Sequence, residues 1–159
     1  MNNSLFRKQA LGPFFWLFLL KKLPLAFIAG VKLKQLDDTG SITQLKFKWI
    51  NQNPFRSIYF AAMQMAAELA TGLLLFQFRD SSPFSMLLVS TQADYHKKAI
   101  GIIYFSCNEG QKVSQYIKDM LLNPSGETIK LPVEAKNSAG ELVANFLFTW
   151  SCKGNKAQK

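Results

Sequence analysis

The sequence predicts an α+β fold in which an antiparallel sheet of six strands curls around one long, buried helix. The stretch from residue 58 to residue 78 is apolar nearly all round a helix and has one charged side chain, Glu68. Such a helix must be buried in protein or in lipid. The segments on both sides of it alternate apolar and polar residues with a period of two, as strands with one solvated face do. One sheet wrapped around the helix covers all of these apolar faces.

The composition fits one domain. The chain has 159 residues, of which 48% are hydrophobic and 18% are charged, and its fourteen phenylalanines suggest a large apolar cavity or an extensive interface. The formal net charge is +9, but the basic residues are spread along the chain and form no stripe that would follow a phosphate backbone. We therefore expect no nucleic-acid partner, and the positive field fits anionic ligands or membrane lipid.

The cysteines and the histidine do not form a metal-binding pattern. Cys107 and Cys152 lie in apolar runs, where we expect reduced, buried thiols. Neither belongs to a zinc motif and His96 is the one histidine, so we expect no metal. The apolar run at 14–20 is short and lacks a small-residue cleavage site, which argues against a secretory signal peptide. These features predict a cytoplasmic protein.

Residues 1–29 are predicted to form a helical extension. The apolar halves of 13–29 are each under ten residues long and are separated by Lys21, Lys22 and Pro24. A spanning helix needs about twenty apolar residues in a row. This segment therefore either packs on the domain or lies at a membrane surface with its lysines among the headgroups. Because its two prolines break up any single amphipathic face, we favour packing, with peripheral membrane contact as the alternative.

The main domain is predicted to span residues 30–153, followed by a loose tail at 154–159. It opens with a hairpin whose two strands alternate apolar residues with lysines and other polar residues around a turn at 37–40. The central helix comes next, and Ser57 or Asn53 is expected to cap its N-terminus.

Four strands and one small helix are expected after the central helix. The first of these strands is apolar on both sides at 86–89, so we expect it in the interior of the sheet. The small helix has apolar side chains at helical spacing. The predicted strands are 31–34, 44–49, 84–93, 100–107, 128–136 and 141–152, and the small helix is 111–122.

The few polar side chains of the central helix fall in one row. Ser57, Gln64, Glu68 and Thr71 are separated by steps of seven, four and three, which place them along one side of a helix. Because burial disfavours the charged form of a carboxylate, we expect a raised pKa for Glu68. A lone acid with a perturbed pKa in an apolar wall is a candidate functional group.

Four sequence stretches resemble one known family. They are Asn53-Pro54 before the helix, AAELATG within it, ADYHKKAIG after the next strand, and the closing hairpin VEAKNSAGELVANFLFTW. In this order and spacing they resemble the hotdog-fold acyl-CoA thioesterases. The resemblance is greatest to the branch with the phenylacetate-pathway enzymes, and to an uncharacterised subgroup with a similar N-terminal segment. It covers residues 30–153.

The resemblance implies a homodimer, or a tetramer, in which two sheets join edge to edge. An acyl-CoA or acyl-carrier thioester would bind at the dimer interface, with CoA present as part of the substrate and no other cofactor. Glu68 stands where the family has its catalytic acid, as base or nucleophile, and Asn53 stands where relatives have an amide side chain. Gln64 would hold the water or the carbonyl, and Thr71 would orient the carboxylate.

The resemblance also implies a substrate-binding set and one departure from the family. Tyr59-Phe60-Ala61 stands where many relatives have His-Gly-Gly, so the amide of Phe60 can still donate to the thioester oxygen while its ring crowds the ligand. Lys97 and Lys98 would attract the phosphates of CoA as point charges.

Structural roles compete with each of these assignments. Glu68 could instead form an ion pair with Arg56 or Arg79 of a partner subunit, since a buried Glu is uncommon unless paired. Asn53 could be a simple turn residue. Lys97 and Lys98 could be a solvated strand end. Gln64 and Thr71 could make interface hydrogen bonds. The alternative function is a non-catalytic hotdog protein that binds an acyl group or lipid.

Overall fold

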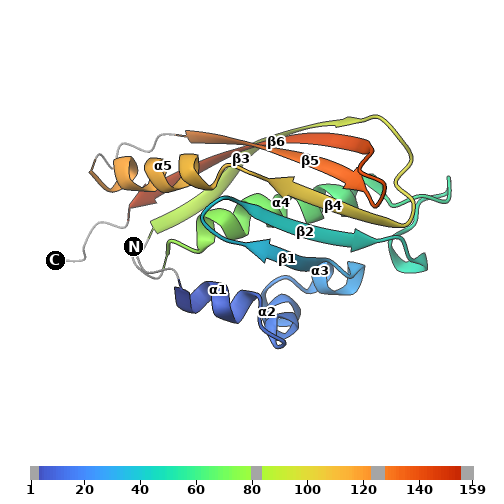
Figure 1. Cartoon of the computed structure of the whole chain (residues 1–159), viewed down its shortest axis with the longest axis horizontal. Helices are drawn as coiled ribbons and strands as arrows, with labels where there is room; N and C mark the ends of the chain where they lie inside the picture. The colour runs from blue at the N-terminus through green and yellow to red at the C-terminus, as the bar shows by residue number, and fades with distance from the viewer. Residues whose placement is uncertain (1–3, 80–83, 123–127, 155–159) are drawn as a thin grey trace.

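The structure is a computed structural model that describes residues 4–79, 84–122 and 128–154. Three short helices precede a curled sheet and its central helix (Figure 1). The elements are α1 (Ser4–Ala10), α2 (Phe15–Lys22), α3 (Pro24–Ala29), β1 (Lys32–Leu36), β2 (Ser41–Lys46), the 3-10 turn η1 (Trp49–Asn51), α4 (Phe60–Phe76), β3 (Phe84–Tyr95), β4 (Ile102–Cys107), α5 (Gly110–Leu122), β5 (Thr128–Asn137) and β6 (Leu142–Gly154).

The six strands form one antiparallel sheet in the order β1-β2-β4-β5-β6-β3. The central helix α4 lies against this sheet and contacts β1, β2, β4, β5 and β6, while the sheet curls around it (Figure 1). Ten of the 17 residues of α4 are buried, which explains why the helix is apolar on nearly every side. The predicted fold class is therefore confirmed.

Two hydroxyl groups of β2 attach the sheet to the backbone of α4. Ser41 Oγ donates to the carbonyl oxygen of Ala70 over 2.5 Å, and Thr43 Oγ1 donates to the carbonyl oxygen of Ala66 over 2.7 Å. Both hydroxyl side chains are buried. The alanines leave the helix surface low enough for the strand to approach, and each helix carbonyl has a second lone pair free to accept.

The start of α4 differs from the prediction. The helix begins at Phe60, its N-cap residue is Tyr59, and no side chain caps it, so the expected cap by Ser57 or Asn53 is wrong. Residues before it are held extended by other elements: the backbone N–H of Ile58 donates to Ala99 over 2.9 Å, and Ile58 forms an isolated bridge with Gln52. A residue held in a bridge cannot also begin a helix.

Two strand predictions are also wrong. β3 is an edge strand that pairs with β6 alone, and Leu87 and Val89 are 68% and 54% exposed, so this strand is not interior. β2 ends at Lys46, and Trp49 lies in η1, where it is 78% exposed. Both errors come from taking apolar periodicity as a sign of burial, which it does not guarantee.

The N-terminal helices lie along the β1 side of the molecule (Figure 1). α1 contacts β1, and α3 contacts both α4 and η1. Arg7 of α1 pairs with Asp38 in the turn between β1 and β2, and its Nε donates to Gln77 Oε1 over 2.7 Å. The extension therefore packs on the domain, although few of its side chains are buried there: Phe6, Ala10, Leu19, Ala26 and Ala29.

Candidate functional site

Glu68 lies in the middle of α4 at the margin of an apolar hollow. Within the described residues its carboxylate has no hydrogen-bond or ion-pair partner, and the alternative pairing with Arg56 or Arg79 of a partner subunit stays a prediction. Desolvation by burial raises the pKa of Glu68 above its ordinary value of 4.5. The expected direction of the shift is confirmed, and its cause is the apolar surroundings rather than a neighbouring charge.

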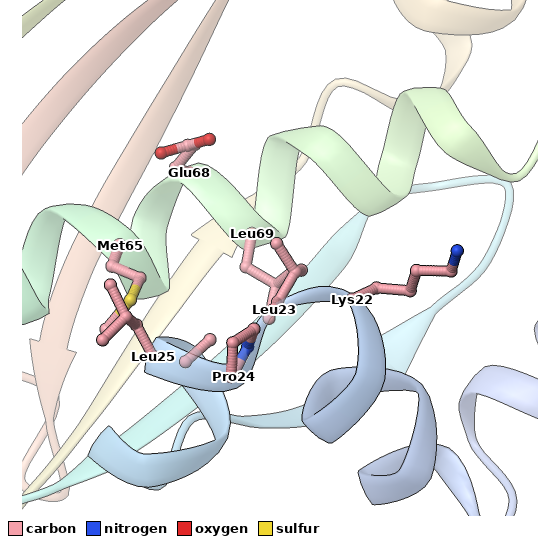
Figure 2. A pocket seen from close by; sticks show the side chains of 8 residues that line it. Lys22, Leu23, Pro24, Leu25, Met65, Glu68 and Leu69 are labelled. Carbon is pink, nitrogen blue, oxygen red and sulfur yellow. The ribbon is translucent and has the colours of Figure 1, made fainter.

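Two adjoining pockets of about 320 Å³ and about 440 Å³ share Glu68 in their walls. Their common wall also contains Lys22, Leu23 and Leu69, so the hollow lies between α4 and the turn from α2 to α3. Figure 2 shows Met65 and Leu69 directed from α4 toward Leu23 and Leu25, while the carboxylate of Glu68 points away from these leucines and from the amine of Lys22. The larger pocket continues past Gly72 and Phe76 to Met86 of β3 and Trp150 of β6.

Two members of the predicted polar row, Gln64 and Thr71, contact the sheet, while Ser57 lies before the start of α4. Gln64 Nε2 donates to Thr91 Oγ1 of β3 over 3.1 Å. Thr71 Oγ1 donates to the backbone carbonyl of Glu68 over 2.9 Å and accepts the indole N–H of Trp150 over 3.0 Å. The hydroxyl of Thr71 is thus used by backbone and indole partners, and the catalytic roles of Gln64 and Thr71 stay predictions.

A second hollow, of about 240 Å³, collects four of the predicted site residues: Asn53, Phe60, Lys97 and Lys98. The rings of Phe60 and Tyr95 lie 4.3 Å apart between centroids, and Tyr95 Oη donates to the carbonyl of Phe60 over 3.4 Å. These contacts fix Phe60 against the strand that follows α4. Tyr59 and Ala61 are exposed on either side of it.

Asn53 shapes the loop in front of α4. Its Oδ1 accepts the backbone N–H of Phe55 over 3.0 Å and both the backbone N–H and the hydroxyl of Ser57 over 3.2 Å. This is the turn role that the sequence left open. Within the described residues its amide Nδ2 donates to no group, so that end of the side chain is free for a ligand.

The two lysines differ in their surroundings. Lys97 Nζ forms an ion pair with Glu141 Oε1 at 2.8 Å, and both side chains are about half exposed. Such an exposed pair contributes little to stability. Lys98 is exposed, and in the part of the chain that the structure describes it makes no ion pair.

The structure does not bring Asn53 and Glu68 together within one chain. They line different hollows, and the eight steps along α4 from Phe60, which lines the Asn53 hollow, to Glu68 advance about 12 Å. No substrate atom can contact both ends of this stretch at once. If Asn53 and Glu68 act on the same group, one of them must come from another subunit.

The profile of the family described as "Domain of unknown function (DUF4442)" matches residues 14–152. The chain belongs to this family. A search of the curated proteins found no match. The DUF4442 match includes α2 and α3 as well as the sheet, so the helices that wall the Glu68 pockets lie within the family's domain.

Solved structures share the fold of this DUF4442 chain. A protein of unknown function from Pseudomonas aeruginosa, described as a probable thioesterase, is 16% identical with a TM-score of 0.78, covering 98% of this chain and 97% of that one. A protein of unknown function from Chlorobaculum tepidum is 14% identical with a TM-score of 0.76, covering 87% of this chain and 91% of that one. With the sheet order above, these likenesses establish the hotdog fold.

A third similar structure is a thioesterase enzyme from Staphylococcus aureus. It is 15% identical with a TM-score of 0.65, and the match covers 82% of this chain and 98% of that one. That structure has a glutamine replaced by alanine, and a second structure of the same protein has a glutamate replaced by alanine fifteen positions further on.

Sequence reasoning missed the second wall of the Glu68 pockets. Lys22, Leu23 and Leu25 come from the N-terminal extension, and nothing in its local pattern says which part of the domain it covers. Other titratable groups form no further site: within the described residues, no three His, Cys, Asp or Glu side chains cluster as metal ligands would. Cys107 and Cys152 are free and buried, and burial raises the pKa of their thiols to about 12 and about 11.

Proposed function

We propose that this protein hydrolyses an acyl thioester at an interface between two of its subunits, with Glu68 as general base or nucleophile. The observation that carries the proposal is the position of Glu68. An unpaired carboxylate with a raised pKa stands at the margin of an apolar hollow large enough for an alkyl chain. A base whose pKa is moved toward the working pH is suited to take a proton from water.

The chemistry needs few groups. The carboxylate of Glu68 removes a proton from a water molecule, and the oxygen of that water bonds to the carbonyl carbon of the thioester. The carbonyl oxygen takes up the negative charge. The intermediate collapses by breaking the carbon–sulfur bond, and the proton held by Glu68 passes to the leaving sulfur. The products are a fatty acid and a thiol, and the enzyme returns to its starting state.

The N-terminus of α4 can stabilise the negative oxygen. No side chain caps this helix, and the first intrahelical bond is donated by Met63 to Tyr59. The N–H groups of Phe60 and Ala61 therefore have no partner within the helix. Backbone donors fixed at the positive end of a helix dipole are suited to an oxyanion.

A homodimer would bring the separated groups together. β3 is a long, exposed edge strand, and such edges pair readily with a second strand. Pairing of β3 with its copy would place two α4 helices on the same face of one continuous sheet. The Asn53 loop of one subunit could then approach Glu68 of the other. Asn53 and Glu68 are also fifteen positions apart, the same spacing as the amide and the acid replaced in the Staphylococcus aureus thioesterase.

The carrier is proposed to be CoA or an acyl-carrier protein. Lys97 and Lys98 lie with Asn53 around one hollow, and their charges are of the right sign for the phosphates of either carrier. We further propose that the protein acts in the cytoplasm without a metal or another cofactor.

The test is hydrolysis of a panel of acyl-CoAs of increasing chain length. The reaction is measured by the appearance of the free thiol. Removing a general base lowers kcat by about 10²–10⁴-fold, so Glu68→Gln should lose activity to that extent. Glu134→Gln is the matched control, because Glu134 is an exposed acid on β5 whose partner is Lys136. Loss of activity in both variants, or in neither, contradicts the assigned role of Glu68.

The second candidate function is binding without turnover. Phe60 stands in the hollow next to Asn53 and its ring is held against Tyr95, so it narrows the approach to the N-terminus of α4. Wild-type protein that binds acyl-CoA in a calorimeter but releases no thiol above the buffer background would support this candidate and exclude the hydrolase.

A further inference from the structure

The outer surface of the N-terminal helices is strongly apolar. Between residues 11 and 28, nine large apolar side chains are exposed, and we call them the N-terminal apolar face. They include Phe14, Trp16, Leu20, Leu23, Leu25 and Ile28. Soluble monomers rarely expose a contiguous apolar patch beyond a few hundred Å². Nine exposed side chains of this kind on one short segment are typical of a surface that contacts a partner.

In helix α2 the contrast between an apolar sequence and an exposed surface is greatest. It reads FWLFLLKK, so its first six residues are all apolar, yet Leu19 is its one buried residue. A helix that is apolar all round is normally enclosed by protein or lipid. The domain encloses only one side of α2, and the other sides face outward.

The charged residues of the N-terminal segment itself all have the same sign. The first 36 residues contain no Asp or Glu, and their exposed lysines are Lys8, Lys21, Lys22, Lys32 and Lys34. Lys21 and Lys22 end α2 directly before Leu23. An apolar surface bordered by cations matches a bilayer with anionic headgroups, where the apolar side chains enter the acyl boundary and the lysines meet the phosphates.

The apolar surface continues onto a neighbouring turn. η1 contacts α3, and Asn51 Nδ2 donates to the carbonyl of Ala29 over 3.0 Å, which holds the two elements together. Trp49 and Ile50 of this turn are exposed. Trp16 and Trp49 are thus both at the surface, and tryptophan is enriched at membrane–water interfaces.

We propose that the N-terminal apolar face docks this protein on the surface of an anionic phospholipid bilayer. No helix among the described residues is long and apolar enough to cross a membrane, so the contact is with one leaflet. A second copy of the chain is a poorer occupant. A twofold contact would set the same cluster of lysines against itself, with no acid in the segment to neutralise it.

Docking would place the hollow beside Glu68 next to the lipid. Leu23 and Leu25 belong to the exposed face and also line the pocket of about 320 Å³ that contains Glu68. An acyl chain could pass between these side chains without crossing water, which favours long-chain thioesters that partition into membranes. This consequence for the substrate rests on the proposed function, but the docking itself does not.

The test is flotation with vesicles of phosphatidylcholine alone and of phosphatidylcholine and phosphatidylglycerol in equal parts. Wild-type protein should float with the anionic vesicles, and high salt should release it. Lys21→Gln with Lys22→Gln should weaken binding about fivefold for each lysine. Leu25→Ser should weaken binding to both kinds of vesicle. The protein should also show a blue shift of its tryptophan emission when it binds.

Matched variants on α5 and at the end of β6 serve as controls. Leu122 is 79% exposed and Leu25 is 72% exposed, and both lie in helices, so Leu122→Ser removes equal apolar surface elsewhere. Lys118→Gln with Lys153→Gln removes equal charge. Both controls should float as the wild type does. The proposal is overturned if wild type stays in the supernatant with anionic vesicles, or if controls and test variants weaken binding equally.

One further result would assign the face to a second copy instead. In this result wild type does not bind vesicles, and Leu25→Ser, but not Leu122→Ser, lowers the oligomer size in sedimentation velocity. The face is then an interface between two copies of the chain, and the membrane proposal is wrong. A thermal melting curve for each variant shows that it is folded under the conditions in which its vesicle binding is compared with that of wild type. Thioester hydrolysis is not used in this test, so its outcome is independent of the proposed function.

Discussion

Trp150 donates its indole N–H to the hydroxyl of Thr71 over 3.0 Å, where β6 passes over the centre of α4. Both side chains are buried. This bond joins the sheet to the helix one turn after Glu68, and Trp150 also forms part of the wall of the larger Glu68 pocket. The polar row of α4 is therefore a set of attachment points as well as a candidate catalytic row.

Replacing Thr71 by valine should destabilise the protein by about 1–3 kcal/mol, because the buried indole N–H of Trp150 loses its acceptor. The change keeps the side-chain volume. The midpoint of urea unfolding measures the effect. Thr149→Val is the control, since Thr149 is next to Trp150 but only partly buried. A loss of hydrolysis in Thr71→Val without any loss of stability would instead support the predicted catalytic role of Thr71.

Replacing Glu68 by glutamine should stabilise the folded protein at neutral pH. The folded pKa of Glu68 is raised above its ordinary 4.5, so the unfolded chain ionises first as the pH rises. Folding of wild type becomes less favourable from pH 4.5 upward until the pH passes the folded pKa, and below 4.5 the two proteins should be equal. Urea unfolding at a series of pH values measures the difference.

Glu141→Gln should have the opposite sign in the same experiment. Hydrogen bonds from Lys97 and Asn137 lower the pKa of Glu141, so its charged form favours the folded state. This variant should be less stable than wild type at neutral pH, and the difference should disappear in acid. A stabilising effect of Glu68→Gln that does not depend on pH would contradict the desolvation argument.

The edge strand β3 offers a test of the proposed dimer. Leu87→Lys combined with Val89→Lys should convert the dimer to a monomer, because lysines on an exposed edge strand block pairing with a second strand. Sedimentation velocity measures the size. Leu122→Lys is the control and should leave the dimer intact. If wild type is already monomeric at micromolar concentration, the proposed shared site is wrong.

Mixing two inactive variants tests whether the site is shared. Asn53→Ala and Glu68→Gln should each be inactive alone. After they are unfolded together and refolded as an equal mixture, half of the dimers are mixed, and each mixed dimer has one intact site of two, so about a quarter of the wild-type activity should return. No return of activity, with dimers present, means that Asn53 and Glu68 do not act across the interface.

Most of the fold follows from periodicity. The alternation in the closing hairpin and in 100–107 predicts strands because each has one buried face, and the helical spacing in 111–122 predicts α5. The errors arise where tertiary contacts, rather than local sequence, determine the backbone conformation. Ser57 is a good N-cap residue by type, but the bond from Ile58 to Ala99 holds this segment extended. β3 is apolar on both sides although Leu87 and Val89 are exposed in one chain. The proposed pairing of β3 with a second copy would account for this composition.

The candidate site was predictable in part. Glu68 stands out in the sequence because it is the one charged residue in a long apolar helix, and the structure gives it a raised pKa and an apolar hollow. The second wall of that hollow was not predictable, because packing of α2 and α3 against α4 depends on shape over a long sequence separation. The separation of Asn53 from Glu68 follows from helix length, which the sequence does contain.

The pair of hydroxyl bonds from β2 has a mechanical consequence. Ser41 and Thr43 are two residues apart on a strand, about 6.8 Å, and their acceptors Ala70 and Ala66 are four residues apart on a helix, about 6.0 Å. This near match fixes the position of α4 along the sheet, because a shift by one residue would leave both hydroxyls without their carbonyl acceptors. Glu68 lies between Ala66 and Ala70 in the sequence of α4, so its position along the helix axis is fixed relative to the sheet. A bulkier ligand must therefore be accommodated by outward movement of α2 and α3.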